Sequence, residues 1–215
     1  MKIIHIMPMM NKINNNFDSD SVYGGWAKPI IEKLIPVKED YIYEYWKMYD
    51  SEVVKSKQVI VKTKDRIRYR FFPSIKVFPF GFISSSMVSY LREVKVKEKI
   101  LVHIQSQPHI PMSYLIASKC KNIPLVGYQG GPSGPPWFKF YFRKNPFFLL
   151  LHIIDRLLLP RFDFIMGGSS TEVNYINRTY GIGRSKIVRR KSIDFNSTEK
   201  FDRFKLREEL NLPQE

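Results

Sequence analysis

The stretch KILVHIQ, residues 99–105, has the clearest strand pattern in the chain and decides how the rest is interpreted. Its apolar, β-branched run predicts a strand buried in the middle of a sheet. A helical segment follows at 111–121, and IPLVGY at 123–128 predicts the next strand. A strand, a helix and a second strand in this order predict two parallel neighbours joined by a crossover helix.

The same alternation continues in both directions from this unit. We expect further strands at 2–7, 41–46, 58–63, 67–72, 75–80, 163–166 and 186–190, those at 58–63 and 67–72 being paired. We expect helices at 26–34, 84–97, 147–159, 171–180 and 204–210. Serines at 84–86 predict an N-cap, and Gly181 predicts a C-cap. The pattern predicts an α/β fold with a mostly parallel sheet and helices on both faces.

Composition limits the classes of partner. The chain has 215 residues and a formal charge of +15, from 35 basic and 20 acidic side chains. A charge of this sign suits phosphorylated small molecules, an anionic membrane or nucleic acid. We expect no nucleic acid, because no recognition helix, zinc-finger spacing or RNA-binding signature is present.

The cysteine count and the N-terminus indicate the compartment. Cys120 is the single cysteine, so the chain can form no internal disulfide and no cysteine-based metal site. The apolar run at 3–7 is shorter than a secretory signal requires. We therefore expect a cytoplasmic protein.

Three motifs carry a family resemblance. The motifs are YGGWAKPIIEKL (23–34), LVHI (101–104) with IPLVGYQGG (123–131), and FDFIMGGSS (162–170) followed by YGIGRSKIV (180–188), SID (192–194), Phe201 and REELNL (207–212). In order and spacing they resemble the N-terminal domain of the large retaining glycosyltransferase family that includes glycogen synthase-like and mannosyltransferase enzymes, glycosyltransferase family 4. The resemblance covers nearly the whole chain.

That resemblance implies one half of a GT-B fold, in which two Rossmann-like domains face a cleft. Residues 1–200 would form the acceptor-side domain, and 201–215 would begin the connection to a donor-binding domain that this sequence does not include. The implied reaction moves a sugar from a nucleotide-sugar donor to a glycan or lipid-linked acceptor, without a metal or other cofactor. No catalytic residue is assigned, because the family places the groups that handle the donor in the other domain. A separate donor-domain subunit is a further candidate partner.

Gly24 and Gly25 lie between the first strand and the expected helix at 26–34. Glycine lets a backbone approach a ligand closely, and a helix N-terminus favours anions, so this loop is a candidate neighbour of the donor phosphates. A plain tight turn is the alternative. The spacing is not that of a dinucleotide-binding glycine loop.

Gln129 and Gly130 follow the strand at 123–128, at a carboxyl strand end where open α/β sheets bind ligands. Related enzymes often have a histidine at this position, whereas this chain has Gln129. An amide can bind sugar hydroxyl groups but cannot act as a general base, so proton chemistry by this residue is not expected.

Gln105 and His109 follow the strongest strand and complete the set of candidate acceptor-binding residues. His109 facing solvent in a loop is an equally good interpretation. His5, His103 and His152 lie within expected strands or a helix, so we interpret them as structural. Asp155 and Asp163 are also interpreted as structural, because no two carboxylates have a catalytic spacing.

Residues 138–159 combine basic, aromatic and aliphatic side chains. A helix that covers the sheet is one interpretation, and a surface that meets anionic lipid is the other. The second interpretation suggests a peripheral position on the inner face of a membrane. It also keeps open a function of another class, a non-catalytic module that docks on a lipid phosphate or on a partner subunit.

Overall fold

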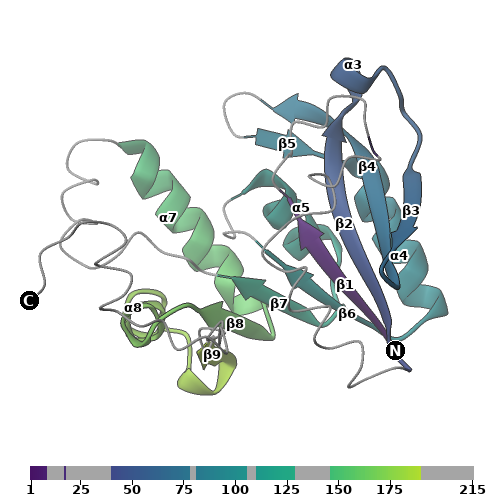
Figure 1. Ribbon diagram of the computed structural model, residues 1–215. Helices are drawn as coiled ribbons and strands as arrows, with labels where there is room; N and C mark the ends of the chain where they lie inside the picture. Colours follow the sequence, from purple (N-terminus) through teal and green to yellow (C-terminus); the bar gives the residue numbers. More distant parts are fainter. Residues whose placement is uncertain (9–16, 18–39, 78–80, 106–109, 129–145, 190–215) are drawn as a thin grey trace, which may run out of the picture.

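A mixed sheet forms the centre of the chain (Figure 1). The computed structural model describes residues 1–8, 17, 40–77, 81–105, 110–128 and 146–189. Within these residues the strands are β1 (Lys2–Met7), β2 (Ile42–Asp50), β3 (Ile60–Lys64), β4 (Ile67–Val77), β5 (Gly81–Ile83), β6 (Ile100–Ile104), β7 (Leu125–Tyr128), β8 (Phe164–Gly167) and β9 (Ile187–Arg189). Their order is β3-β4-β2-β1-β6-β7-β8-β9, and β5 pairs with β4.

The topology reverses direction at β1. From β1 the chain moves to β2 and β4 on one side, and it later returns to β6, β7, β8 and β9 on the other side. All of these neighbours are parallel, whereas β3 and β5 are antiparallel to β4. This is the strand order of a Rossmann-like sheet, with a topological switch point between β1 and β6. The predicted α/β class and the mostly parallel sheet are confirmed.

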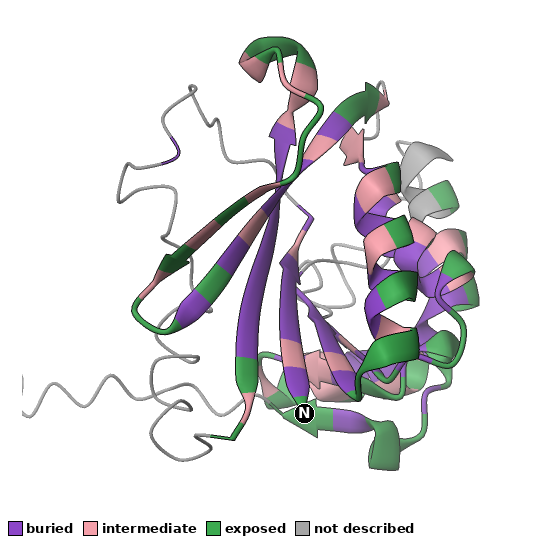
Figure 2. Ribbon diagram, turned by 90° about the vertical axis from the view of Figure 1, so that its right-hand side faces the viewer, coloured by how far each residue is buried: buried purple, intermediate pink, exposed green. Residues whose placement is uncertain are grey.

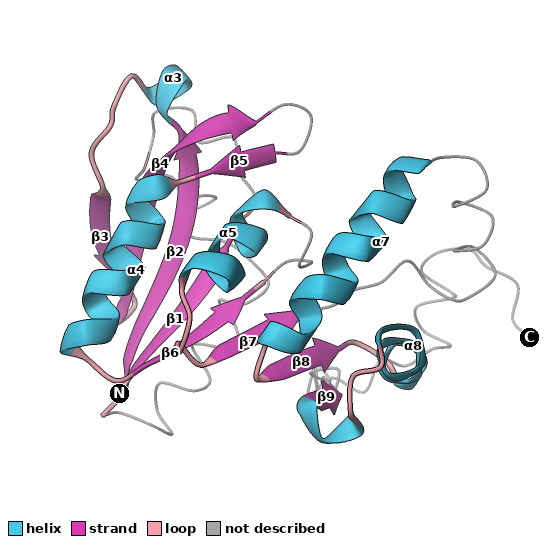
Figure 3. Ribbon diagram, turned by 180° about the vertical axis from the view of Figure 1, so that it is seen from behind, coloured by secondary structure: helices cyan, strands magenta, loops and turns pink. Residues whose placement is uncertain are grey.

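Helices cover one face of the sheet, as seen in front of it in Figure 3. The described helices are α3 (Ser51–Val54), α4 (Ser85–Lys97), α5 (Pro111–Lys119), α7 (Pro146–Leu158) and α8 (Ser170–Tyr180), with 3-10 turns η1 (Leu159–Arg161) and η2 (Arg184–Lys186). The predicted caps are present: the Ser84 hydroxyl accepts from Met87 N, and Gly181 ends α8 at a φ of 69°. The helices expected at 26–34 and 204–210 lie outside the described residues.

Strand alternation gives the sheet two different faces, and most of its central residues are buried (Figure 2). On β2, Trp46 and Met48 point to the helical face, where they join a large aliphatic core with α4 and α5. Tyr43, Tyr45 and Tyr49 point the other way. With Phe17, Ile67, Tyr69 and Phe71 they form what we call the aromatic face.

Two strands are longer than expected, and two short elements were not expected. β2 continues through Lys47 to Asp50, and β4 joins the stretches predicted separately at 67–72 and 75–80, up to Val77. Pro73 does not break β4, because β3 pairs only as far as Phe71 and β5 pairs from Ile75. Proline is tolerated where a strand edge has no partner to receive its missing N–H. The single turn α3 and the strand β5 escaped prediction because of their length.

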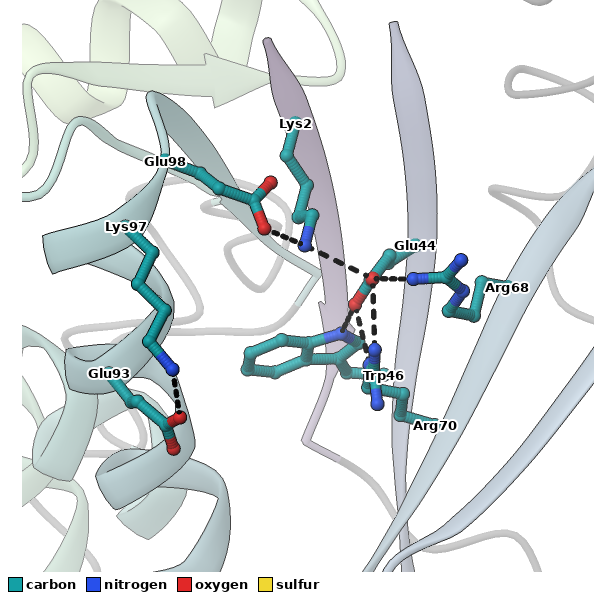
Figure 4. A network of polar contacts seen from close by, with 8 residues as sticks. All are labelled: Lys2, Glu44, Trp46, Arg68, Arg70, Glu93, Lys97 and Glu98. Carbon is teal, nitrogen blue, oxygen red and sulfur yellow. Dashed lines mark hydrogen bonds and ion pairs between the residues drawn. The ribbon is translucent and has the colours of Figure 1, made fainter.

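A buried carboxylate joins three basic side chains on the helical face (Figure 4). Glu44 is fully buried, and its carboxylate lies 2.8 Å from Arg70 Nε, 3.4 Å from Arg68 Nη1 and 3.4 Å from Lys2 Nζ. The indole N–H of Trp46 donates to it over 2.8 Å. Burial alone raises the pKa of Glu44, but the Arg70 and Trp46 hydrogen bonds and the nearby cations outweigh burial and lower it. Glu44 therefore ties β1, β2 and β4 together.

Candidate functional site at the sheet switch point

The switch point between β1 and β6 is where a sheet of this topology is expected to bind ligands. Here β1 ends at Met7 and β6 ends at Ile104. The next residue, Gln105, continues the pairing, because its backbone N–H donates to Ile6 O over 2.8 Å. The structure therefore places Gln105, a residue proposed from sequence, at the carboxyl edge of the sheet beside Met7.

The Gln105 side chain belongs to a buried polar cluster on the aromatic side of the sheet. Its carbonyl Oε1 accepts a hydrogen bond from the Tyr45 hydroxyl at 3.2 Å, and this hydroxyl also lies 3.4 Å from the Met7 sulfur. Its amide Nε2 lies 3.4 Å from His5 Nδ1. His5 Nδ1 is in turn 3.0 Å from His103 Nδ1. Five side chains, of Met7, Tyr45, Gln105, His5 and His103, thus form one chain of contacts.

His5 Nδ1 is the common point of these contacts. The Gln105 amide nitrogen and His103 Nδ1 both lie within hydrogen-bonding distance of it, and the donor and acceptor roles between the two rings depend on their tautomers. Burial, followed by the neighbouring His103, lowers the pKa of His5 to about 3. His5 is therefore neutral at physiological pH and cannot serve there as an acid.

A cation and two tyrosines extend this cluster across the sheet. His103, His5, Tyr45 and Tyr69 are register partners on four adjacent strands, and the rings of the two tyrosines lie 5.8 Å apart. Lys47 Nζ lies 5.0 Å from the centre of the Tyr45 ring. Burial lowers the pKa of Lys47 to about 8, and burial followed by Tyr69 raises that of Tyr45. At pH 7 the cluster thus contains a lysine that is largely protonated and the neutral hydroxyl group of Tyr45.

This arrangement can position a polar ligand but offers little proton chemistry. The Gln105 amide is held from both sides, by Tyr45 and by His5. No carboxylate takes part in the hydrogen bonds that join Tyr45, Gln105, His5 and His103. Across the described ranges no three His, Cys, Asp or Glu side chains are placed to hold a metal ion. The cluster suits hydrogen bonding and orientation.

The remaining candidate site residues cannot be placed relative to this cluster. Gly24, Gly25, His109, Gln129 and Gly130 all lie outside the described residues. Their roles therefore remain predictions from the sequence.

The aspartates interpreted as structural have structural surroundings. Asp163 Oδ2 accepts from Leu125 N over 2.8 Å, so it closes the start of β7 against β8. Asp155 is buried in α7, close enough to Tyr180 to help raise the pKa of that tyrosine, after burial itself. Neither carboxylate belongs to the cluster at the switch point.

Sequence reasoning missed Tyr45 and Lys47 and treated His5 and His103 as packing residues. A signal was available, because polar residues recur at every second position of the strands that flank the switch point. The sequence of β2 puts Tyr43, Tyr45, Lys47 and Tyr49 on one face, and that of β6 puts His103 and Gln105 on one face. Aligning these faces across the sheet requires the register, which the sequence does not provide.

Comparison with solved structures identifies the fold. Sucrose-phosphate synthase from Thermosynechococcus elongatus superposes with a TM-score of 0.55 at 13% identity, over 99% of this chain and 53% of that one. The chain has the Rossmann-like fold of one half of a GT-B structure. An α,α-trehalose-phosphate synthase (UDP-forming) from Burkholderia vietnamiensis aligns over 85% of this chain and 44% of its own, at 12% identity and a TM-score of 0.47. The structure of trehalose-6-phosphate from E. coli bound with UDP-2-fluoro glucose aligns over 80% of this chain and 41% of its own, at 10% identity and a TM-score of 0.47.

The chain spans about half the length of the sucrose-phosphate synthase that it matches. These structural neighbours are GT-B glycosyltransferases of low sequence identity. No family model and no curated protein matches the sequence. The likeness therefore fixes the fold, and the activity is a separate question.

Proposed function

We propose that this chain is the acceptor-side half of a retaining glycosyltransferase of the family 4 type. It would hold a glycan or lipid-linked acceptor while a donor-binding domain supplies the nucleotide sugar. The proposal rests on the GT-B half fold and on one observation above all: a fixed amide, Gln105, at the β1/β6 switch point. Polar groups held at this position are suited to bind sugar hydroxyls.

The chemistry of the cluster supports a binding role in this half. His5 has its Nδ1 engaged and its pKa lowered to about 3, so it is a poor proton carrier. Tyr45 has a raised pKa and donates to Gln105. Neither group is suited to general acid or base catalysis near neutral pH. Leaving-group stabilisation would then come from the donor-binding domain.

Acceptor binding can be tested on the full chain by NMR, with a panel of monosaccharides and disaccharides as probes. We expect binding shifts at Met7, Gln105 and their strand neighbours. In Gln105→Leu the affinity should fall roughly tenfold, because the buried amide that holds Tyr45 and His5 together at this edge of the sheet is lost. Gln58→Leu, at an exposed glutamine, is the matched control. Shifts that avoid the switch point, or equal affinities for both variants, would contradict the proposal.

A second candidate function, docking on an anionic membrane, is favoured by the surface of α7. Leu150, Ile153 and Leu157 are 46%, 45% and 68% exposed, and their spacing puts them on one stripe of the helix. Arg156 and Arg161 are exposed close to the stripe, and the chain carries a charge of +15. Apolar residues beside cations are typical of a helix that lies in the interface of an anionic bilayer. At 13 residues α7 is shorter than a membrane span, and no other described helix has the length and apolar content of one.

Co-sedimentation with vesicles of phosphatidylglycerol and phosphatidylcholine tests this candidate. Binding should weaken by an order of magnitude or so in Leu150→Gln/Leu157→Gln, because each change removes buried apolar area at the interface. Val53→Gln, at a valine on α3 that is 54% exposed, is the control. If both variants bind as the parent does, α7 is not a membrane surface. Such binding would suit a peripheral position on the inner face of the membrane and a lipid-linked acceptor.

A further inference from the structure

A pocket lies at the other end of the sheet, away from the switch point. It is open, has a volume of about 570 Å³, and lies where α4 and α5 end, next to the amino ends of β6 and β7. Basic side chains dominate its lining, which consists of Arg92, Lys95, Val96, Ser118, Lys119, Cys120, Lys121 and Ile123. Four of these eight residues are cationic and none is acidic.

Two of the cations are held in place by backbone carbonyls. Arg92 donates from Nε and Nη2 to Lys119 O, over 3.3 Å and 3.0 Å. Lys95 Nζ donates to Lys121 O over 2.9 Å. A guanidinium has five N–H donors and an ammonium has three, so both groups keep donors for a further acceptor. Holding these long side chains in advance reduces the conformational entropy that a ligand would have to offset.

The nearest carboxylates along α4 are already engaged elsewhere. Glu93 accepts from Lys97 Nζ over 2.7 Å, and Glu98 accepts from Lys2 Nζ over 2.9 Å (Figure 4). Among the described residues no ion pair joins a carboxylate to any of the four cations of the pocket. Within the described residues, the repulsion among these four cations is therefore not offset by an ion pair with a carboxylate.

Helix capping explains only part of this arrangement. Cations near a helix C-terminus interact favourably with its carbonyls, and this accounts for Arg92 and Lys95 beside the end of α5 and for Lys119 in its last turn. It does not account for Lys121, which lies beyond the helix, or for the gathering of four like charges around one pocket. An anion between the four groups would convert repulsion into attraction.

We propose that this pocket binds a phosphate-bearing ligand, at a site separate from the transfer cleft. Phosphate carries about two charges near neutral pH and accepts several hydrogen bonds, which matches one guanidinium and three ammonium groups. The volume falls in the range of roughly 300–1,000 Å³ typical of small-molecule sites, so a phosphate ester or a diphosphate fits as well as a bare ion. The phosphate can belong to a soluble ester or to a lipid headgroup.

The soluble source is tested by calorimetric titration of the full chain with inorganic pyrophosphate at low ionic strength. The double charge reversal Lys119→Glu/Lys121→Glu should weaken binding by roughly tenfold or more, because it replaces two attractive charges with repulsive ones. The control Lys57→Glu/Lys76→Glu changes the net charge equally, at exposed lysines outside the pocket. A loss that is equal in both variants would show a diffuse charge effect and overturn the proposal.

The lipid source is tested with vesicles that contain phosphatidic acid, using the same two double variants. A specific loss only with vesicles assigns the site to a headgroup, and a specific loss only with pyrophosphate assigns it to a soluble phosphate. Either result supports the pocket as a phosphate site. No specific loss in either assay overturns it. Arg92→Gln, which adds no negative charge, should show the same direction with a smaller effect and guards against misfolding of the double variant.

Discussion

The carboxylate of Glu44 provides the sharpest test of how the sheet is held together. In Glu44→Gln the side chain keeps its shape and loses its charge. Lys2, 4% exposed, and Arg70, 12% exposed, would then be left without their anion on the helical face. Lys2 would retain Glu98, and Arg70 would retain its position 4.7 Å from the centre of the Tyr90 ring.

The expected loss of stability follows from burial. Removing one partner of a buried ion pair typically lowers the free energy of unfolding by about 3–5 kcal/mol. For a chain of this size each kcal/mol shifts Tm by roughly 2–4 °C, so we expect a fall of about 6–20 °C. Arg68→Gln is the matched control, since Arg68 is 45% exposed and its ion pair contributes less than about 1 kcal/mol.

Urea denaturation followed by far-UV circular dichroism measures both variants against the parent. The reasoning requires Glu44→Gln to unfold at a much lower urea concentration than Arg68→Gln. If the two midpoints agree within error, the network is not a stabilising feature of the sheet. The slope of the transition should stay constant, which would show that the change is in stability and not in the compactness of the unfolded state.

Two further predictions concern the switch-point cluster and the packing of β7. The pKa of His5 is lowered to about 3 in the fold, so below pH 6.5 the unfolded chain binds more protons than the folded chain, and the free energy of unfolding should fall by about 2 kcal/mol between pH 7 and pH 5. Denaturation of a His5→Gln variant at the two pH values should lack this part of the pH dependence. An unchanged pH dependence in the variant would refute the assignment. Gly127→Ala should lower the free energy of unfolding by about 1–3 kcal/mol, because its Cβ would lie 2.7 Å from a ring carbon of the buried Phe162. In the control Gly183→Ala the new Cβ has no contact nearer than 3.8 Å, so the free energy of unfolding should stay within about 0.5 kcal/mol of the parent.

Local signals in the sequence predicted much of the fold. Ser84 caps the start of α4, and Gly181 ends α8 with positive φ. Such features depend on neighbours within a few residues, so they can be recognised before the structure is known. The parallel order of the central strands followed from the alternation of strands and helices.

Features that depend on distant contacts were predicted less well. The strand expected at 41–46 continues to Asp50, because Lys47 is buried beside Tyr45 within it. The pairing of His5 with His103 joins residues 98 positions apart and depends on the register of β1 with β6. Gln105 was correctly selected as lying at the carboxyl edge, but its partners were not foreseen, because no local pattern encodes them.

The central claim, that this chain is the acceptor-side half of a glycosyltransferase, is tested most directly by a complementation assay. The full chain is incubated with a panel of nucleotide sugars and acceptors, alone and with a GT-B donor-binding domain added as a second polypeptide. Our account predicts negligible transfer by either half alone, transfer by the two together, and a marked loss of that transfer in Gln105→Leu but not in Gln58→Leu. Robust transfer by the isolated chain, or a reconstituted activity that is indifferent to Gln105, would contradict it.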